Sequence, residues 1–451
     1  MNPAERESGA DGAPSRTGLR RVAENVSWLI GERSLLLALN FIVSVWFINY
    51  LGPSMYGKYA YAVSFATLFA SLATLGLDNI VIRELSRSAD KHGEILGTAF
   101  VMRLGSSVMT FGLIAMSIFL FRDDPTTRVL VLVVAVSVLA DPTQVVDLWF
   151  QSRIESKYVA WMRVGVSLAS ILAKVALIVL QMPLIAFAWL YAVQAVAMGL
   201  GFILVFALRR PPDLLLRRSV SRAAELLRDS WPLIVSGLSV TIYMRIDRVM
   251  LGQMLGDQDV GTYSTAATIS EVWNIFPVIV ATSLFPIVVR SKESGNERLY
   301  AQRMQALFDV MTLGAYAVVI PMTLLAPWLI DLLFSSDFAG SAAILQVHIW
   351  SLIFVALGVS RSRFIVAENL IRFSMWATLA GGAINVLLNW ILIPRAGGVG
   401  AAWATLISYG MAAYVSGLFV GSMRPTTLQM TRALLAPLRP RAAAREIREI
   451  L

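Results

Sequence analysis

Apolar segments long enough to cross a lipid bilayer recur along the whole of this 451-residue chain. A helix of ~20 apolar residues spans ~30 Å of hydrocarbon, and in lipid its backbone N–H and C=O groups must pair within the segment. Hydrophobic residues make up 57% of the chain, charged residues 15%, and the mean hydropathy is +0.68. So little polar surface excludes a soluble protein of this length. The sequence therefore predicts an integral membrane protein built of α-helices.

About twelve segments have the required length, and we expect each of them to form one transmembrane helix. They cover residues 28–50, 59–77, 96–121, 129–149, 159–180, 183–208, 231–254, 262–289, 305–334, 341–364, 372–393 and 398–422. The prediction is an all-α polytopic membrane protein with two lobes of six helices each. Its parts are an N-terminal arm (1–27), an N-lobe (28–208), a basic linker (209–230), a C-lobe (231–422) and a basic tail (423–451).

Two short stretches of the chain match each other at one constant offset, and each lies between two apolar segments. The matching residues are Leu51, Gly52, Gly57, Tyr59 and Ala62 in the first stretch and Leu255, Gly256, Gly261, Tyr263 and Ala266 in the second. The alternative is a pair of unrelated hairpins that each need glycine in the turn. Internal repeats are common in secondary transporters, because two related bundles can rock about a shared central site. The match favours two similar halves.

Basic residues gather on one side of the predicted helices. With the N-terminus in the cytoplasm, most of the 38 Lys and Arg lie in the N-terminal arm, the inner connections and the tail. Only Lys58, Arg122, Arg128 and Arg395 lie in the outer connections. By the positive-inside rule both termini are cytoplasmic, and the net charge of +9 reflects topology, so no nucleic-acid partner is expected. We expect the linker and the tail to lie solvated on the inner leaflet, with lipid recognition as the alternative.

Charge inside the membrane is costly and usually functional. The cations within the predicted spans are Arg33, Arg103, Arg163, Lys174, Arg245 and Arg248. Arg163 and Lys174 lie three turns apart on one face of a helix, Arg245 and Arg248 share a face of another, and Arg33 shares a face with Asn40. We expect all of these to line one anion-attracting cavity, except Arg103, which is expected to snorkel to the interface. Snorkelling is also open for Arg33 and Arg163.

Four acids lie within the predicted spans: Asp141, Asp147, Asp247 and Glu271. Asp141 precedes Pro142, which lacks a backbone N–H and should bend its helix. A carboxylate at a bend is a candidate for H⁺ or Na⁺ coupling, and simple neutralisation of a neighbouring cation is the alternative. Asp247 lies about 200° around its helix from Arg245, so we expect it to face a different helix.

The sequence carries no strong signal of an enzyme or a cofactor. There are no cysteines, and no GxxxxGK[ST] loop that would bind a nucleotide. The two histidines, His92 and His348, stand apart, so no metal site is expected. Asp257 and Asp259 resemble the acidic pair of a glycosyltransferase, but they lie in a short outer connection where acids are common.

Six stretches of the chain carry a family resemblance: residues 47–59, 80–85, 245–252, 260–264, 385–394 and 397–405. In this order and spacing they resemble the polysaccharide flippases, the Wzx-type branch of the multidrug/oligosaccharidyl-lipid/polysaccharide (MOP) superfamily. The same superfamily holds the MATE-type multidrug antiporters and the lipid II flippases. The similarity extends from about residue 25 to residue 422.

This resemblance implies two six-helix lobes that form a MATE-like inverted V around a cationic cavity. It implies transport of undecaprenyl-diphosphate-linked oligosaccharides from the inner to the outer leaflet of the bacterial inner membrane, for surface polysaccharides such as O-antigen, capsule or exopolysaccharide. It places basic residues in helices one and seven, which correspond to Arg33 and to Arg245 or Arg248. A polysaccharide polymerase and glycosyltransferases of the same pathway are the implied partners.

Three alternatives stay open at this point. A MATE-type drug antiporter exports cations, so its cavity should be acidic. A lipid II flippase has two further helices that this chain lacks. A membrane polysaccharide polymerase, the enzyme alternative, should show a large outer loop, and the outer connections of this chain are short.

Overall fold

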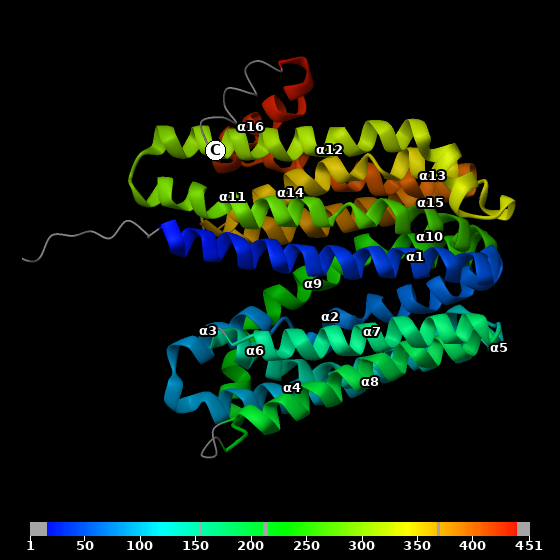
Figure 1. Ribbon diagram of the computed structural model, residues 1–451, viewed down its shortest axis with the longest axis horizontal. Helices are drawn as coiled ribbons and strands as arrows, with labels where there is room; N and C mark the ends of the chain where they lie inside the picture. The colour runs from blue at the N-terminus through cyan, green and yellow to red at the C-terminus, as the bar shows by residue number, and fades with distance from the viewer. Residues whose placement is uncertain (1–15, 154, 211–214, 368–369, 440–451) are drawn as a thin grey trace, which may run out of the picture.

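The computed structural model of the chain describes the backbone of residues 16–153, 155–210, 215–367 and 370–439. Within these ranges side chains are described from Ala38 onward, apart from those of residues 89, 286, 363, 366, 367 and 371. The described secondary structure is helical and contains no β-strand (Figure 1). The prediction of an all-helical protein is confirmed.

The N-terminal half begins with α1, the longest helical segment of the chain. Its helices are α1 (Arg16–Leu68), α2 (Ala70–Thr74), α3 (Asp78–Arg87), α4 (His92–Phe121), α5 (Pro125–Ala135), α6 (Val145–Ser152), α7 (Lys157–Val179) and α8 (Leu184–Arg209). α1 is broken at Gly52, whose φ of 68° is a left-handed conformation that glycine adopts without strain, and Pro53 follows. At this break the chain reverses direction, so α1 contains the first predicted span and part of the second (Figure 1).

A stretch of 3₁₀-helix, η2 (Val136–Gln144), separates α5 from α6. Pro142 lies within it and donates no backbone hydrogen bond, which is consistent with the bend expected after Asp141. The start of α5 is fixed by Asp124, whose side chain accepts hydrogen bonds from the backbone N–H groups of Thr126 and Thr127. The predicted span 129–149 is therefore three shorter helical pieces in sequence.

The C-terminal half repeats the pattern of a helix broken at a left-handed glycine. Its helices are α9 (Val220–Met254), α10 (Asp257–Val272), α11 (Ile275–Glu293), α12 (Glu297–Leu333), α13 (Ser341–His348), α14 (Ser351–Ala367), α15 (Ile371–Ala413) and α16 (Arg424–Leu434). Gly397, with φ of 55°, divides α15 between the two predicted spans of residues 372–393 and 398–422.

In the described part of the chain, nine helical segments are long and apolar enough to cross a membrane. Two of these, Ala38–Arg87 and Arg372–Phe419, hold 50 and 48 residues and contain the breaks at Gly52 and Gly397. α9 is not among the nine, and it carries charged residues along much of its length. The chain is thus a multi-pass membrane protein, while the count of twelve crossings stays a prediction.

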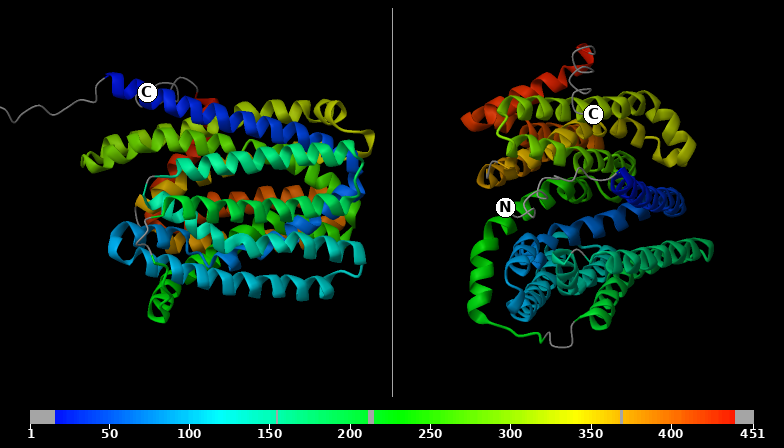
Figure 2. Two further views of the ribbon diagram at one scale, coloured as in Figure 1. Left: turned by 60° about the horizontal axis from the view of Figure 1, so that its bottom comes forward. Right: turned by 60° about the vertical axis from the view of Figure 1, so that its left-hand side comes forward.

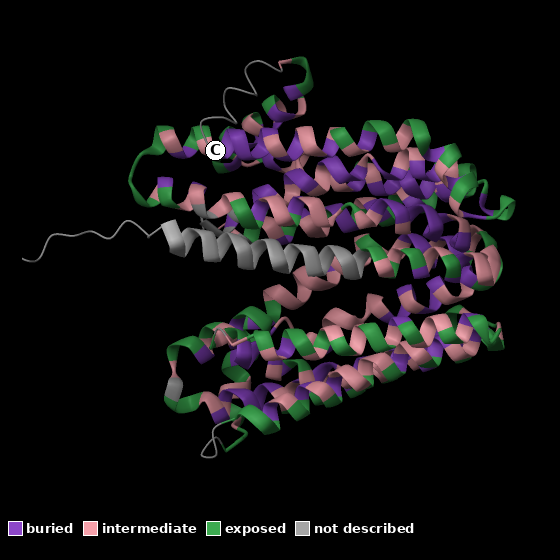
Figure 3. Cartoon of the chain, viewed as in Figure 1, coloured by how far each residue is buried: buried purple, intermediate pink, exposed green. Residues whose placement is uncertain are grey.

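The helices form two groups in space. Helices α2 to α8 lie together, α10 to α16 form a second group, and α1 and α9 run between the two (Figure 1; Figure 2, right). Buried residues gather inside the groups, and exposed residues face outward (Figure 3). Many exposed side chains are large and apolar, among them Leu172, Leu324 and Trp376, as expected of a surface that contacts lipid.

The two glycine turns of the repeat lie against each other at one end of the molecule, which we call the hairpin end. A Cβ atom on Gly57 would lie 1.7 Å from the backbone oxygen of Asp257, and one on Gly261 would lie 1.9 Å from the backbone oxygen of Pro53. Pro53 and Asp257 occupy equivalent places in the repeat. The contact therefore has an approximate two-fold symmetry, and each half needs glycine for the same reason.

The described part of the linker is docked on the N-terminal helices. The N–H of Arg217 donates to the carbonyl of Gly93 on α4 at 3.0 Å, and α9 begins at Val220, inside the predicted linker. Arg222 forms an ion pair with Glu84 on α3 at 3.5 Å. This part of the linker is thus anchored to α3 and α4 while most of its residues are exposed, and residues 211–214 lie outside the described residues.

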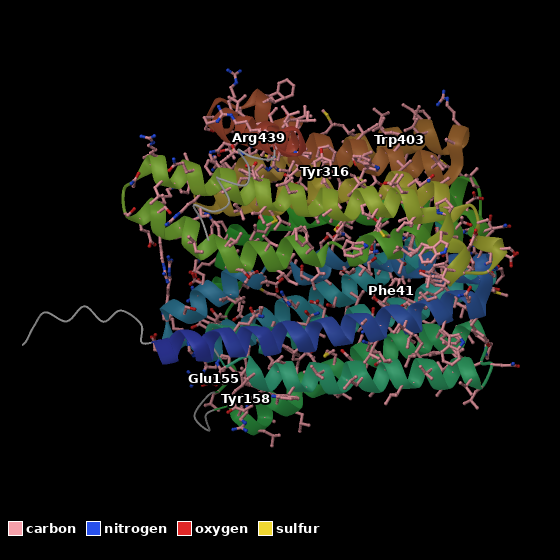
Figure 4. The ribbon with its side chains drawn as sticks, turned by 45° about the horizontal axis from the view of Figure 1, so that its top comes forward. Phe41, Glu155, Tyr158, Tyr316, Trp403 and Arg439 are labelled. Atoms are coloured by element: carbon pink, nitrogen blue, oxygen red, sulfur yellow. The ribbon has the colours of Figure 1, made fainter. Side chains whose placement is uncertain are left out.

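The tail is docked as well. The hydroxyl of Tyr316 on α12 donates to the carbonyl of Leu434 at 3.2 Å, and Met430 and Ala433 of α16 are fully buried. Figure 4 shows Tyr316 on α12, and Arg439 beyond the end of α16. Residues 424–439 are thus anchored by the apolar face of α16, which covers α12, while the opposite face of this segment is exposed.

Candidate functional site

Two arginines and one glutamate from neighbouring helices form what we call the arginine–glutamate cluster. Arg245 and Arg248 project from one face of α9, and Glu271 lies near the end of α10. Nη2 of Arg248 lies 2.8 Å from Oε1 of Glu271, and Nη1 of Arg245 lies 3.8 Å from Oε2. A single carboxylate thus faces two guanidinium groups, so the cluster keeps an excess positive charge.

The two arginines differ in how far they are buried. The side chain of Arg248 is 6% exposed, whereas those of Arg245 and Glu271 are 34% and 31% exposed. Glu271 holds Arg248 with a short, charge-assisted hydrogen bond and holds Arg245 only by a longer ion pair. Arg245 is therefore the group that an approaching anion meets first.

The N-terminal half approaches this cluster from the other side. The hydroxyl of Tyr56 on α1 lies 3.2 Å from that of Thr268, one turn before Glu271 on α10. Tyr191 of α8 is close enough to Arg245 to interact with it electrostatically. The cluster thus lies where the two groups of helices face each other.

Asp247 belongs to a separate network and faces away from the two arginines, in agreement with its place on α9. It is 3% exposed and accepts hydrogen bonds from Asn389 at 2.5 Å, Thr405 at 2.6 Å and Tyr263 at 2.9 Å. No ion pair involves Asp247 in the described part of the chain. Three neutral side chains thus donate hydrogen bonds to this buried carboxylate, as a buried polar group requires.

Sequence reasoning missed the partners of Asp247, although the signal was present. Tyr263 belongs to the internal repeat and to the stretch 260–264, and Asn385, Asn389 and Thr405 lie in the stretches 385–394 and 397–405 that carry the family resemblance. Asn389 also donates to Asn385 at 3.1 Å. Hydrophobic periodicity does not reveal which polar side chains meet across helices that are far apart in the sequence.

Arg103 is the clearest error of the sequence prediction. It is not at the interface but fully buried, where it forms an ion pair with Asp78 and lies 3.7 Å from Asp141. One oxygen of Asp141 accepts from Gln144 at 3.0 Å, and the other has no hydrogen-bond partner among the described residues. The side chain of Arg103 reaches acids on α3 and η2, which the local sequence around it does not predict.

Arg163 and Asp147 form a second ion pair in the N-terminal half, with 2.6 Å between Nη2 and Oδ2. Gln151 also donates to Asp147 at 2.7 Å. A cavity of about 200 Å³ is lined by Arg163 together with Asp141 and Gln144. Asp147 therefore neutralises Arg163, and a small polar pocket opens beside the pair.

Lys174 stands without a carboxylate. It is half-buried on α7, and its ammonium nitrogen lies 5.4 Å from the ring centre of Phe47 on α1. No described ion pair involves Lys174, and no described contact joins it or Arg163 to the arginine–glutamate cluster. Asn40 is exposed on α1, and the side chain of Arg33 lies outside the described residues.

Over the described side chains, no group of three or more His, Cys, Asp or Glu is arranged to hold a metal ion. His348 is buried beside Tyr263, with 5.8 Å between the ring centres. The chemistry that the site offers is thus electrostatic: positive charge at the interface of the two helix groups, with the buried carboxylates of Asp141, Asp147 and Asp247 away from it.

Comparison with known proteins gives matches over most of the chain. Residues 22–292 match a family model described as polysaccharide biosynthesis protein, and residues 232–391 match one described as MatE. The chain is 25% identical over 392 residues to the probable low-salt glycan biosynthesis flippase Agl15 of Haloferax volcanii, covering 83% of this chain and 78% of that protein. It is also 25% identical over 224 residues to the uncharacterized membrane protein YabM of Bacillus subtilis, covering 48% of this chain and 41% of that protein.

Solved structures with the same fold are transporters. The lipid II flippase MurJ in an inward closed conformation superposes with a TM-score of 0.70 at 14% identity, over 90% of both chains. An inward-facing MATE family transporter of the MOP superfamily gives 0.68 at 16% identity, over 88% of this chain and 96% of that one. An outward-facing MATE family transporter of the MOP superfamily superposes with a TM-score of 0.56 at 17% identity, over 88% of this chain and 94% of that one. The chain therefore has the fold of these transporters.

Proposed function

The chain belongs to the polysaccharide biosynthesis protein family and is a MOP-type flippase, and we propose that its cargo is an undecaprenyl-diphosphate-linked oligosaccharide. It carries this cargo from the inner to the outer leaflet of a bacterial inner membrane, for the synthesis of a surface polysaccharide. The observation that carries this proposal is the arginine–glutamate cluster, in which two guanidinium groups share one carboxylate.

A diphosphate fits the excess charge of this cluster. Glu271 orients Arg248, and the half-exposed Arg245 presents a planar group that binds phosphate oxygens in pairs. Glu271 holds Arg245 only weakly, across 3.8 Å, so an incoming diphosphate can bind Arg245 without breaking a strong ion pair. The glycan then occupies the wet space between the lobes, and the prenyl chain stays in lipid. Lys174 of the N-lobe, which has no described carboxylate partner, adds positive charge to the proposed path, and Arg33 and Arg163 stay candidates for the same role from the sequence.

The proposed topology has twelve crossings, with both termini in the cytoplasm. The breaks at Gly52 and Gly397 divide two long segments into pairs of spans, and α9 supplies a further span. The lobes are residues 28–208 and 231–422, arranged as an inverted V that opens away from the hairpin end. The better match to inward-facing transporters supports this direction of opening.

Ion coupling in this proposal falls to two of the four acids. Asp147 and Glu271 hold arginines by short hydrogen bonds, whereas Asp141 faces Arg103 only across 3.7 Å and Asp247 is held by neutral donors alone. A carboxylate without a tight cationic partner can exchange H⁺ or Na⁺ as the lobes move. No cofactor is required, and a polymerase and glycosyltransferases of the pathway remain the proposed partners.

A cation-coupled drug antiporter is the second candidate, since residues 232–391 match the MatE model. The sign of charge at the lobe interface decides between the two, because a cationic drug requires acidic groups where this chain presents Arg245 and Arg248. The lipid II flippase shares the fold at 14% identity, which supports the architecture but not the cargo.

The test is to delete the gene, keep the sugar-assembling enzymes, and label lipid-linked oligosaccharides on intact cells to find which leaflet holds them. We expect accumulation on the inner leaflet, relieved by the wild type and by the matched control Arg290→Gln, an exposed arginine on α11. The double variant Arg245→Gln/Arg248→Gln should not relieve it. Absence of accumulation, together with sensitivity to cationic dyes, would instead assign the chain to the antiporters.

A further inference from the structure

Arg361 on α14 is a buried cation that the proposed transport site does not use. The residue is 6% exposed, and none of the described ion pairs involves it. Its Nη1 donates to the hydroxyl of Ser416 at 3.0 Å, its Nε has no hydrogen-bond partner in the described part of the chain, and its guanidinium carbon lies 5.4 Å from the ring centre of Phe373. A buried charge with neutral neighbours alone is costly, and in membrane segments such groups usually serve a ligand.

This side chain lines a cavity of about 260 Å³ between α9, α14 and α15. The polar residues around the cavity all carry hydroxyls: Tyr243, Ser362, Ser374, Thr378 and Tyr409. The rings of Tyr243 and Tyr409 meet edge to face, 5.0 Å apart, and their hydroxyls make no hydrogen bond to any described group. The cavity lining thus contains one cation, several hydroxyl donors and no carboxylate.

Such a lining selects an anion, and its geometry favours a phosphate. The Nε and Nη2 groups of a guanidinium lie on one edge, and in Arg361 neither donates to any described residue, so this edge can bind two oxygens of one oxyanion. A phosphate has further oxygens that accept from the tyrosine hydroxyls. The rest of the lining is apolar, including Phe354, Val355 and Ile365, which suits the chain of a lipid.

The pocket opens on a different face of α9 from the arginine–glutamate cluster, and Tyr409 lies between them, close enough to Arg245 to interact with it electrostatically. Tyr243 and Arg245 are two residues apart on α9 and so lie about 200° apart around the helix axis. Arg361 lies six residues before Ala367, the end of α14, and therefore about 9 Å from the end of the bundle opposite the hairpin end. We propose that the Arg361 pocket is a second, phosphate-binding site that holds the phosphate of a membrane lipid at this end of the C-terminal helices.

Two lipids supply this chemistry, a polyprenyl phosphate and an anionic phospholipid, and one titration distinguishes them. The delipidated full chain in nonionic detergent is titrated with undecaprenyl phosphate, with phosphatidylglycerol and with phosphate-free undecaprenol, and bound lipid is counted by native mass spectrometry. The variants are Arg361→Gln and the matched control Arg372→Gln, an exposed arginine at the start of α15.

We expect Arg361→Gln to weaken binding of at least one phosphate lipid about tenfold or more, since a hydrogen bond to a charged group contributes that much affinity. Arg372→Gln should bind as the wild type does, and undecaprenol should bind weakly to all three proteins. Loss confined to undecaprenyl phosphate identifies the polyprenyl lipid, loss confined to phosphatidylglycerol identifies the phospholipid, and loss of both indicates recognition of the phosphate itself. Unchanged binding of both phosphate lipids, or equal binding of undecaprenol, overturns the proposal.

Two further measurements keep the test decisive if Arg361→Gln fails to fold. Inorganic diphosphate should displace the bound lipid from the wild type, and failure to displace it overturns the proposal without any variant. Arg361→Lys keeps the charge but loses the paired donors, so it should bind more weakly than the wild type.

The double variant Arg245→Gln/Arg248→Gln should retain lipid binding at the Arg361 pocket. This variant separates the pocket from the proposed transport function, because either proposal can fail while the other stands.

Discussion

Arg122, which follows α4, and Asp257, the first residue of α10, form an ion pair of 2.5 Å that ties the N-terminal half to the C-terminal half at the hairpin end. Lys58 lies 4.0 Å from the same carboxylate and 2.8 Å from Asp124. The guanidinium of Arg122 also lies 4.5 Å from the ring centre of Tyr61. Asp257 resembled a catalytic acid in the sequence, and its contacts instead make it part of a latch between the two halves.

Asp257→Asn should loosen this latch and shift the molecule toward opening at the hairpin end. A partly buried ion pair of this kind contributes about 0.5–1 kcal/mol, so we expect about a two- to fivefold change in population. The chain has no native cysteine, so spin labels at Ser54→Cys and Gln258→Cys report the distance between the turns without background. Asp259→Asn, which removes an acid with no described ion pair, is the control, and equal distance distributions in the two variants would contradict the latch.

Asp124 should make stability depend on pH. Its hydrogen bond with Lys58 is the main reason that the pKa of Asp124 lies below the usual value for an aspartate. The stabilisation is therefore complete above the unfolded pKa of about 4 and is lost as the pH falls through the lower folded pKa. Asp124→Asn keeps the helix cap but loses the charge, so its melting temperature should be lower than that of the wild type at pH 7, with the difference shrinking toward pH 2. Asp123→Asn, at a fully exposed acid, should show no such trend.

Arg245 and Arg248 should separate transport from stability. Arg245→Gln removes a half-exposed group, so we expect export to fall while the melting temperature stays close to that of the wild type. Arg248→Gln removes the buried partner of Glu271, so it should lower both export and the melting temperature. The leaflet assay in intact cells measures export, and thermal unfolding of the purified variants in detergent measures stability. A large loss of stability in Arg245→Gln would show that its role is structural.

The burial of Arg103 makes this residue important for stability, whereas the sequence predicted that it snorkels to the interface. Arg103→Ala leaves Asp141 buried without a cation and should cost about 3 kcal/mol or more of stability. Lys174→Ala breaks no described ion pair, so its effect should appear in export alone. Thermal unfolding of both variants measures the difference. The double variant Arg103→Ala/Asp141→Asn should recover part of the loss, and no recovery would mean that the carboxylate is not the cause.

The sequence predicted the class of fold because hydrophobic length and glycine position are local properties. It placed the breaks near Gly52 and Gly397, and the spacing of Arg245 and Arg248 placed both on one face of α9. It failed where a partner lies on another helix, since Asp78 is 25 residues before Arg103 and Thr405 is 158 residues after Asp247. Arg361 escaped notice for the same reason, because its isolation depends on the residues that surround it in space.

The paired glycines at the hairpin end set the mechanical character of the molecule. Backbone meets backbone there, at Gly57 and Gly261, without interlocking side chains. Around these two points side chains of both halves also pack, since the ring of Tyr61 lies against Gly252 and its hydroxyl accepts a hydrogen bond from Gln253. A side chain at either glycine would hold the two backbones apart, and every ion pair and apolar contact around the joint would be stretched together.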